Sequence, residues 1–295
     1  MKMHFEKDSA PLLIVLGQSN AHAHGTHLPE AEIIRTPLKN VHGLSREFNQ
    51  AYGLSDVKWT GFTSGGMNLG ETQDDTCCLA NYFAAMWQNA IDGGADLPDL
   101  YVIQISIGAQ GVAQFEAHGD NMWYAFREPI LKPGPLGTCD ISLYPLTTEI
   151  LSIAYMNLMM SGKKPQVIGL HWNQWETECF TGSKALNEAE ANFKNIFWGF
   201  FTALGSDVSG KGVPFYLYRA LSENFEPSRI ERMNAILDSF INNLADCRIM
   251  DLRNTAIYND TPKTHGIFAD DGVHYLPEAH YEFAKRQWKD ILGEE

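Results

Sequence analysis

The sequence has no long run of apolar residues. The longest uninterrupted run near its start covers residues 11–16, whereas a membrane-spanning helix needs about 20 apolar residues. The ten residues before this run carry charges of both signs, and the run itself is too short for the core of a secretion signal. We therefore expect no membrane partner, and we expect a buried strand at residues 12–16.

Basic residues are also scarce. The chain has 22 Lys and Arg against 36 Asp and Glu, a formal net charge of -14, and its basic residues form no cluster of five or more. An acidic surface repels the phosphates of nucleic acids and of anionic lipids. The composition therefore argues against nucleic-acid partners and leaves small, neutral or sugar-like substrates open.

Cysteines are few and poorly spaced for cross-links. The five are Cys77, Cys78, Cys139, Cys179 and Cys247, an odd count with one adjacent pair and no Cys-x-x-Cys spacing. This pattern suits neither a disulfide framework nor a zinc site. We expect a cytoplasmic protein, or a secreted one if a leader has been removed. The oligomeric state stays open.

What the sequence does contain is an alternation of strand and helix patterns. Short apolar runs rich in β-branched residues predict strands, and segments with helical spacing predict helices between them. The strands are expected at 12–16, 100–107, 166–171, 214–218 and 248–252, and the helices at 76–91, 147–161, 183–204, 227–244 and 277–292. The stripe Phe193, Phe197, Trp198, Phe200 and Phe201 is expected to lie in the core.

This alternation predicts a three-layer α/β/α sandwich around a five-stranded, mostly parallel sheet. We expect a single domain over residues 1–295. Two segments, 21–75 and 119–146, are longer than ordinary connections, so they are expected to shape a site. Trp123, Tyr124 and Phe126 in the second segment either offer a sugar an apolar platform or anchor the loop.

Polar residues follow the ends of the predicted strands. In a parallel sheet, ligands bind beyond the carboxyl ends of the strands, where the loops diverge. A serine follows the first strand, a turn of small residues the second, a carboxamide the third and an Asp/His pair the last; these segments are 17–20, 108–111, 172–176 and 271–274. Together they supply the parts for acyl transfer.

Each part has a candidate residue. Ser19 is the expected nucleophile, His274 its general base, and Asp271, three residues before His274, would orient the imidazole. A tetrahedral oxyanion would be met by the Ser19 amide, by a backbone N–H of the Gly108–Ala109 turn and by the side chain of Gln174.

These segments resemble the SGNH hydrolase superfamily, specifically its sialate O-acetylesterase and acetylxylan esterase branch, carbohydrate esterase family six. That branch has a Gly-Gln-Ser-Asn block followed by a glycine, a loosely matched Ala-x-Gly-Gly-Thr block ending in an aromatic residue, a Trp-Tyr-Gln-Gly-Glu block and an Asp-Gly-x-His block. The corresponding positions here are 17–20 with Gly25, 106–110 with Phe115, 172–176 and 271–274.

The resemblance implies a flavodoxin-like sandwich that hydrolyses an O-acetyl ester of an acetylated carbohydrate without a metal or a cofactor. Two positions depart from the pattern. Ala109 stands where the second glycine of its block falls, and Trp175 replaces a glycine beside Gln174. Gly111 lies close enough that the donating amide of this turn is left open. Glu176 matches the family's glutamate, which we expect to brace the loop.

Other interpretations stay open. The His-x-His pair His22 and His24 suggests a metal-dependent hydrolase. The departures at positions 109 and 175 would also permit a non-catalytic carbohydrate-binding module on the same fold. Gln174 is alternatively a structural carboxamide, and Glu176 with Glu178 is alternatively a glycosidase pair. The absence of a Gly-x-Ser-x-Gly elbow argues against the α/β-hydrolase arrangement.

Overall fold

The computed structural model describes residues 3–24, 27, 29, 32–44, 58–64, 67–70, 78–114, 122–126, 130–132 and 139–293. Gly25 and Phe115, two positions of the resemblance, lie outside these residues, as do Cys77 and parts of both long segments. Cys78, Cys179 and Cys247, the cysteines whose side chains the structure describes, form no disulfide with one another.

The centre of the molecule is a seven-stranded sheet with the order β3-β2-β4-β1-β7-β8-β9. Its strands are β1 (Ser9–Gly17), β2 (Val41–Leu44), β3 (Trp59–Gly61), β4 (Leu100–Ser106), β7 (Lys164–Asn173), β8 (Phe215–Tyr218) and β9 (Cys247–Met250). Every pair is parallel except β2 with β3. All five strands predicted from the sequence are present.

The expected strand count of five was wrong, because β2 and β3 extend one edge of the sheet. Both lie in the segment 21–75 that was expected to be a loop. They are four and three residues long, too short to show a periodic pattern, and β2 is held in place by pairing with β4. The second long segment likewise contains a separate two-stranded sheet, β5 (Ile130–Lys132) with β6 (Cys139–Ile141).

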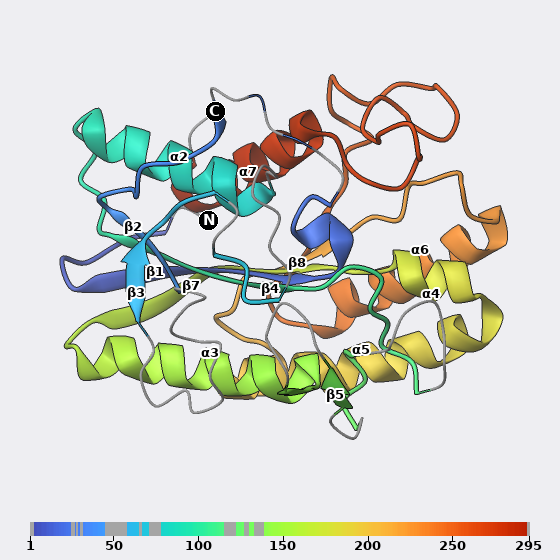
Figure 1. Cartoon of the computed structure of the whole chain (residues 1–295), viewed down its shortest axis with the longest axis horizontal. Coiled ribbons are helices and arrows are strands. Elements are labelled where there is room, and N and C mark those ends of the chain that lie inside the picture. Colours follow the sequence, from blue (N-terminus) through green and yellow to red (C-terminus); the bar gives the residue numbers. More distant parts are fainter. Residues whose placement is uncertain are drawn as a thin grey trace.

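Helices cover both faces of the sheet, which confirms the three-layer prediction (Figure 1). On one face lie α2 (Leu79–Asp92) and α7 (Pro277–Leu292), and on the other α3 (Leu143–Met160), α5 (Ser183–Ala203) and α6 (Pro227–Asn243). The short elements η1 (Ser19–Ala21) and α4 (Glu176–Thr181) were not predicted. None of the described helices combines the length and the apolar character needed to cross a bilayer.

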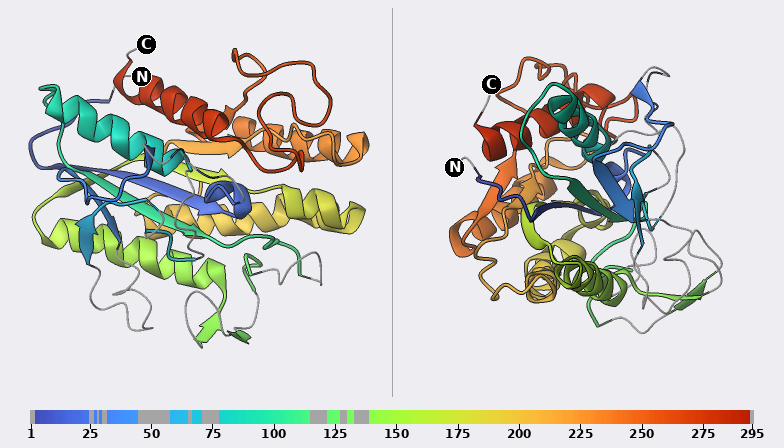
Figure 2. Two further views of the ribbon diagram at one scale, coloured as in Figure 1. Left: turned by 45° about the horizontal axis from the view of Figure 1, so that its top comes forward. Right: turned by 90° about the vertical axis from the view of Figure 1, so that its left-hand side faces the viewer.

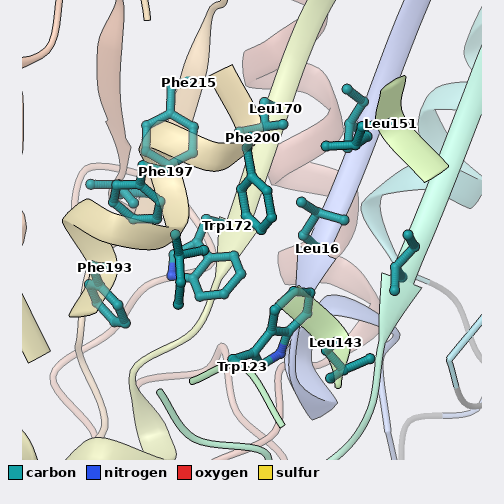
Figure 3. Close-up of a cluster of buried hydrophobic side chains, with 14 of the residues drawn as sticks. Leu16, Trp123, Leu143, Leu151, Leu170, Trp172, Phe193, Phe197, Phe200 and Phe215 are labelled. Carbon is teal, nitrogen blue, oxygen red and sulfur yellow. The ribbon is translucent and has the colours of Figure 1, made fainter. Parts of the chain in front are cut away.

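Side chains of β1 alternate between two apolar layers. Leu12, Ile14 and Leu16 belong to the layer beneath α3, α5 and α6, whereas Leu13 and Val15 belong to the layer beneath α2 and α7. The first layer is rich in aromatic rings from α5, β7 and β8 (Figure 3). The predicted core stripe is confirmed for its four phenylalanines, while Trp198 is only partly buried.

The order of the strands reverses at β1. From β1 the chain builds β2 and β4 on one side and then β7, β8 and β9 on the other. The loops after the parallel strands therefore emerge together at one side of the molecule, beside η1 (Figure 2). A crevice forms at such a reversal because neighbouring loops turn away from each other.

Candidate active site

Ser19 lies directly beyond the end of β1. Gly17 ends the strand with φ 138°, and a Cβ atom there would lie 2.1 Å from the carbonyl oxygen of Asn173 on β7. Only glycine permits this close approach. The chain then turns into η1, which begins at Ser19, so the Ser19 amide has no acceptor within that short helix. The serine is 6% exposed.

A cavity of about 510 Å³ opens beside Ser19. Its lining residues come from the loops after β1, β4, β7, β8 and β9, and all of these except the loop after β8 are strand ends at which the sequence places the chemistry. They are Gln18, Ser19, His24, Gly108, Ala109, Glu176, Thr177, Phe180, Phe225, Asp271, Val273 and His274. The volume lies within the range of small-molecule sites and is much larger than an acetyl group.

Asp271 and His274 form a hydrogen-bonded pair. His274 Nδ1 lies 2.6 Å from Asp271 Oδ2. The other oxygen, Oδ1, accepts the backbone amides of Val273 at 2.8 Å and of His274 at 3.0 Å. Partial burial opposes ionisation of Asp271, but these bonds outweigh it and hold the pKa of its carboxyl below the ordinary value. The pair leaves Nε2 of the imidazole for other partners.

Ser19 and His274 line the same cavity but do not touch through a hydrogen bond in the described part of the chain. Catalytic hydrogen bonds are commonly long in enzymes without bound substrate and shorten in the reactive complex. A second imidazole lies nearby, since the His24 and His274 ring centroids are 5.2 Å apart.

The turn after β4 contributes backbone to the cavity. Gly108 and Ala109 line it, whereas Gly111 does not and instead accepts the Trp123 amide at 3.2 Å. Ala109 has φ 56°, the left-handed conformation that glycine adopts most easily. The alanine that departs from the Gly-Gly pattern therefore keeps the conformation expected of a glycine.

Gln174 is buried and does not line the cavity. Its Nε2 donates to Gln18 Oε1 at 2.9 Å, to the Gln110 carbonyl oxygen at 2.8 Å and to Glu178 Oε2 at 3.1 Å. This geometry matches the alternative role of a structural carboxamide. An oxyanion role for Gln174 would require it to leave these acceptors.

The two glutamates of α4 lie in different surroundings. Glu176 lines the cavity and accepts hydrogen bonds from the Asn20 side chain and, at 3.2 Å, from the Trp175 amide. Glu178 is fully buried outside the cavity lining and accepts the Val112 amide at 2.9 Å. Burial raises the pKa of both carboxyls, that of Glu178 to about 7. Because they do not face one space, the glycosidase pairing finds no support.

His22 and His24 point to different partners. His22 is buried, its Nδ1 lies 2.9 Å from Ser106 Oγ, and burial followed by the charges of His24 and His274 lowers its pKa to about 3. His24 lines the cavity. Within the described residues, no three His, Cys, Asp or Glu side chains are grouped closely enough to hold a metal ion.

Aromatic side chains of the cavity wall were missed by the sequence analysis. Phe180 on α4 is 58% exposed at the cavity, and Phe225 after β8 packs edge-on against Trp175. Of the predicted platform, Trp123 is fully buried and donates from Nε1 to the Gly17 carbonyl oxygen at 3.1 Å, so it anchors its loop. Phe126 lines a different cavity. No periodic signal marks Phe180 or Phe225 in the sequence.

Solved structures of low sequence identity have the same fold. The crystal structure of NanS matches with a TM-score of 0.60 at 15% identity, over 97% of this chain and 100% of that chain. A protein from Arabidopsis thaliana matches with a TM-score of 0.60 at 11% identity, over 96% and 99%. This chain shares its fold with both.

A third match is a carbohydrate esterase family 2 enzyme with a carbohydrate-binding domain from Corynascus thermopiles (Myceliophthora fergusii). Its TM-score is 0.47 at 9% identity, over 99% of this chain and 69% of that chain. No family model and no curated protein matches the sequence.

Proposed function

We propose that this protein is a cofactor-independent serine esterase that removes a short acyl group, acetyl in the simplest case, from a carbohydrate hydroxyl. The observation that carries the proposal is a single cavity lined by Ser19 and by an imidazole, His274, whose Nδ1 is bonded to Asp271 at 2.6 Å. The resemblance of the same four segments to carbohydrate esterases supports it, as does the fold shared with NanS.

In the proposed reaction, Ser19 Oγ attacks the ester carbonyl carbon while His274 Nε2 accepts the hydroxyl proton. The tetrahedral intermediate collapses by breaking the bond to the sugar oxygen, which leaves with the proton from His274. Water, deprotonated by the same imidazole, then attacks the acyl carbon. The bond from that carbon to Ser19 Oγ breaks, Oγ regains the proton from His274, and the carboxylic acid is released. Asp271 stabilises the imidazolium that forms in each step.

The oxyanion of the intermediate needs hydrogen-bond donors. We assign it to backbone amides at Ser19 and in the Gly108–Ala109 turn, both of which belong to the cavity lining. Gln174, which the sequence also nominates, donates to Gln18 and Gln110 and would serve only after rearrangement. Gln174→Ala distinguishes an oxyanion donor from a structural carboxamide, because loss of an oxyanion donor should lower kcat by ~10²- to 10³-fold.

The cavity offers space for more than the acyl group. Phe180 and Phe225 form an apolar wall, which suits the C–H face of a sugar ring, and the carboxyl of Glu176 suits sugar hydroxyls. A series of model esters of increasing acyl length, followed by acetylated xylan and acetylated sialic acid, identifies the acyl group and the sugar.

The decisive test is Ser19→Ala. We expect the variant to fold normally and to lose hydrolysis of a chromogenic acetate ester, with Ser152→Ala, a half-buried serine of α3 outside the cavity lining, as the matched control. A fluorophosphonate probe should label the wild-type protein at Ser19 alone. Sugar binding without labelling would indicate a binding module instead, and loss of activity on dialysis against a chelator would indicate the metal-dependent alternative.

A further inference from the structure

Asn20 connects the loop that carries the nucleophile to the loop that carries the base. Its side chain is fully buried. Nδ2 donates to the carbonyl oxygen of Val273 at 2.9 Å, and Oδ1 accepts the amide of Tyr275 at 2.9 Å. Val273 and Tyr275 flank His274 on its two sides. One planar carboxamide therefore holds the backbone immediately before and after the imidazole-bearing residue.

Glu176 sets the direction in which this carboxamide points. Its Oε1 accepts a second hydrogen bond from Asn20 Nδ2, and its Oε2 accepts the Trp175 amide at 3.2 Å. The amide nitrogen thus faces two acceptors and the amide oxygen faces one donor. A flipped amide would set oxygen against two oxygens and nitrogen against an N–H, so one orientation is strongly favoured.

Other contacts hold further parts of the same loop, and within the loop the carbonyl oxygen of His274 accepts the Ala269 amide at 2.8 Å. Ser222 Oγ donates to the Gly272 carbonyl oxygen at 2.5 Å, and Asn224 Nδ2 donates to the Asp271 carbonyl oxygen. These bonds restrain the first half of the loop, and the Asp271 carboxylate restrains the imidazole ring itself. Among the described residues, the bonds from Asn20 are those that tie the backbone around His274 to the segment of Ser19.

We propose that Asn20 is a positioning residue: oriented by Glu176, it clasps the backbone on both sides of His274 and sets the position of the imidazole relative to the neighbouring Ser19. Residues 19 and 20 are adjacent in η1. One peptide unit and the hydrogen bonds of Asn20 therefore connect the nucleophile to the backbone of the base. The inference rests on the proposed esterase function, since it concerns the same Ser19 and His274.

The primary test is Asn20→Ala, measured by steady-state kinetics and by amide hydrogen exchange. We expect kcat to fall by ~10²-fold, because a small displacement of a catalytic group has an effect of this size, while KM changes little. Exchange of amides in segment 269–276 should become faster while the rest of the protein keeps its protection.

The matched control is Asn234→Ala on α6. Asn234 makes the same pair of backbone bonds with a single residue, donating to the Ala220 carbonyl oxygen at 2.9 Å and accepting the Ala220 amide at 3.0 Å. Neither residue lines the cavity. This variant should lose a comparable pair of bonds and show faster amide exchange near residue 220. Its kcat and its amide exchange at 269–276 should stay at wild-type values.

A second pair of variants keeps the test decisive if Asn20→Ala does not fold. Asn20→Asp is nearly isosteric, but it removes the donor to Val273 and sets a carboxylate against Glu176. Adding Glu176→Gln removes that repulsion and restores an N–H donor between the two positions. We expect kcat of the double variant to be at least about tenfold higher than that of Asn20→Asp alone, because a repulsive contact between two carboxylates is replaced by a hydrogen bond to a charged group.

Wild-type kcat in Asn20→Ala, or slower catalysis with unchanged exchange at 269–276, would overturn the proposal. No recovery in the double variant would overturn the orienting role of Glu176. The exchange experiment uses no substrate, so it still decides whether the clasp exists if the wild-type protein hydrolyses no ester. A wild-type protein that hydrolyses no ester would refute the proposed function, independently of the result for the clasp.

Discussion

At the scale of single residues, the site depends on which atom each side chain offers. Asp271 shows this most clearly, because both of its oxygens are engaged: one with the His274 ring and the other with two backbone amides. The first bond selects the tautomer with the proton on Nδ1, and the second pair holds the carboxylate in place. Three residues of separation suffice for this contact, which is why the sequence alone indicated it.

Asp271→Asn tests this role. The amide would present an N–H to Nδ1 and so favour the tautomer with the proton on Nε2, which cannot accept the serine proton. We therefore expect kcat to fall by ~10³- to 10⁴-fold while the fold is retained. Kinetics on a chromogenic acetate ester measure the change. Asp270→Asn is the control, since its exposed side chain lies outside the cavity lining, and it should stay within about twofold of wild type. Equal effects of the two substitutions would contradict the assignment.

At the scale of elements, short contacts join the ends of strands that are distant in sequence. Glu178 on α4 accepts the backbone amide of Val112, in the segment after β4, and the side-chain Nε2 of Gln174, directly after β7. The carboxyl therefore links α4 to the segments that follow β4 and β7. Burial, opposed by these hydrogen bonds and reinforced by the charge of Glu176, raises its pKa to about 7.

This raised pKa predicts a dependence of stability on pH. Between pH ~4.5 and ~7 the folded protein binds a proton at Glu178 that the unfolded chain releases. The contribution of this proton to the free energy of unfolding is therefore complete below pH ~4.5 and is lost as pH rises towards 7. Glu178→Gln should remove this pH-dependent part of the free energy of unfolding, which is on the order of 1 to 3 kcal/mol between the two pH values. Urea unfolding at pH 4.5 and pH 7.5 measures it.

Glu231→Gln provides the matched control, because Glu231 is exposed on α6. Its free energy of unfolding should follow the wild-type dependence on pH. A Glu178→Gln variant that kept the full wild-type slope would show that the buried carboxyl does not hold a proton in this range.

At the scale of the whole molecule, charge governs which substrates approach. The formal net charge is -14, and two of the cavity-lining side chains are carboxylates, Glu176 and Asp271. A field of this sign slows the encounter with anionic substrates and leaves neutral ones unaffected. The surface thus favours neutral substrates over anionic ones at low ionic strength.

This charge predicts how kcat/KM responds to salt. For an anionic acetyl ester, kcat/KM should rise about tenfold between 10 mM and 500 mM NaCl as screening shortens the range of the repulsion. For a neutral ester of the same acyl group it should stay nearly constant. Parallel responses of the two substrates would show that the net charge has no influence on binding.

The amino-acid sequence by itself determined the layers and the polar residues that stand at the strand ends. The continuous apolar run from Leu12 to Leu16 predicted a strand buried on both faces. The helical spacing of Phe193, Phe197, Phe200 and Phe201 predicted a core helix, because burial on a helix repeats with its period. The positions of Ser19, Asp271 and His274 followed from the rule that parallel strands share one ligand edge.

Only the tertiary structure decided the order of the strands and the contacts that cross it. The pairing of β2 with β4, the clasp of Asn20 on the loop of His274 and the Phe180–Phe225 wall join segments that are dozens to hundreds of residues apart. The Nε2 atom of Gln174 likewise found its acceptors only in the folded chain. Local periodicity records which side of an element is buried, whereas these contacts depend on which elements become neighbours.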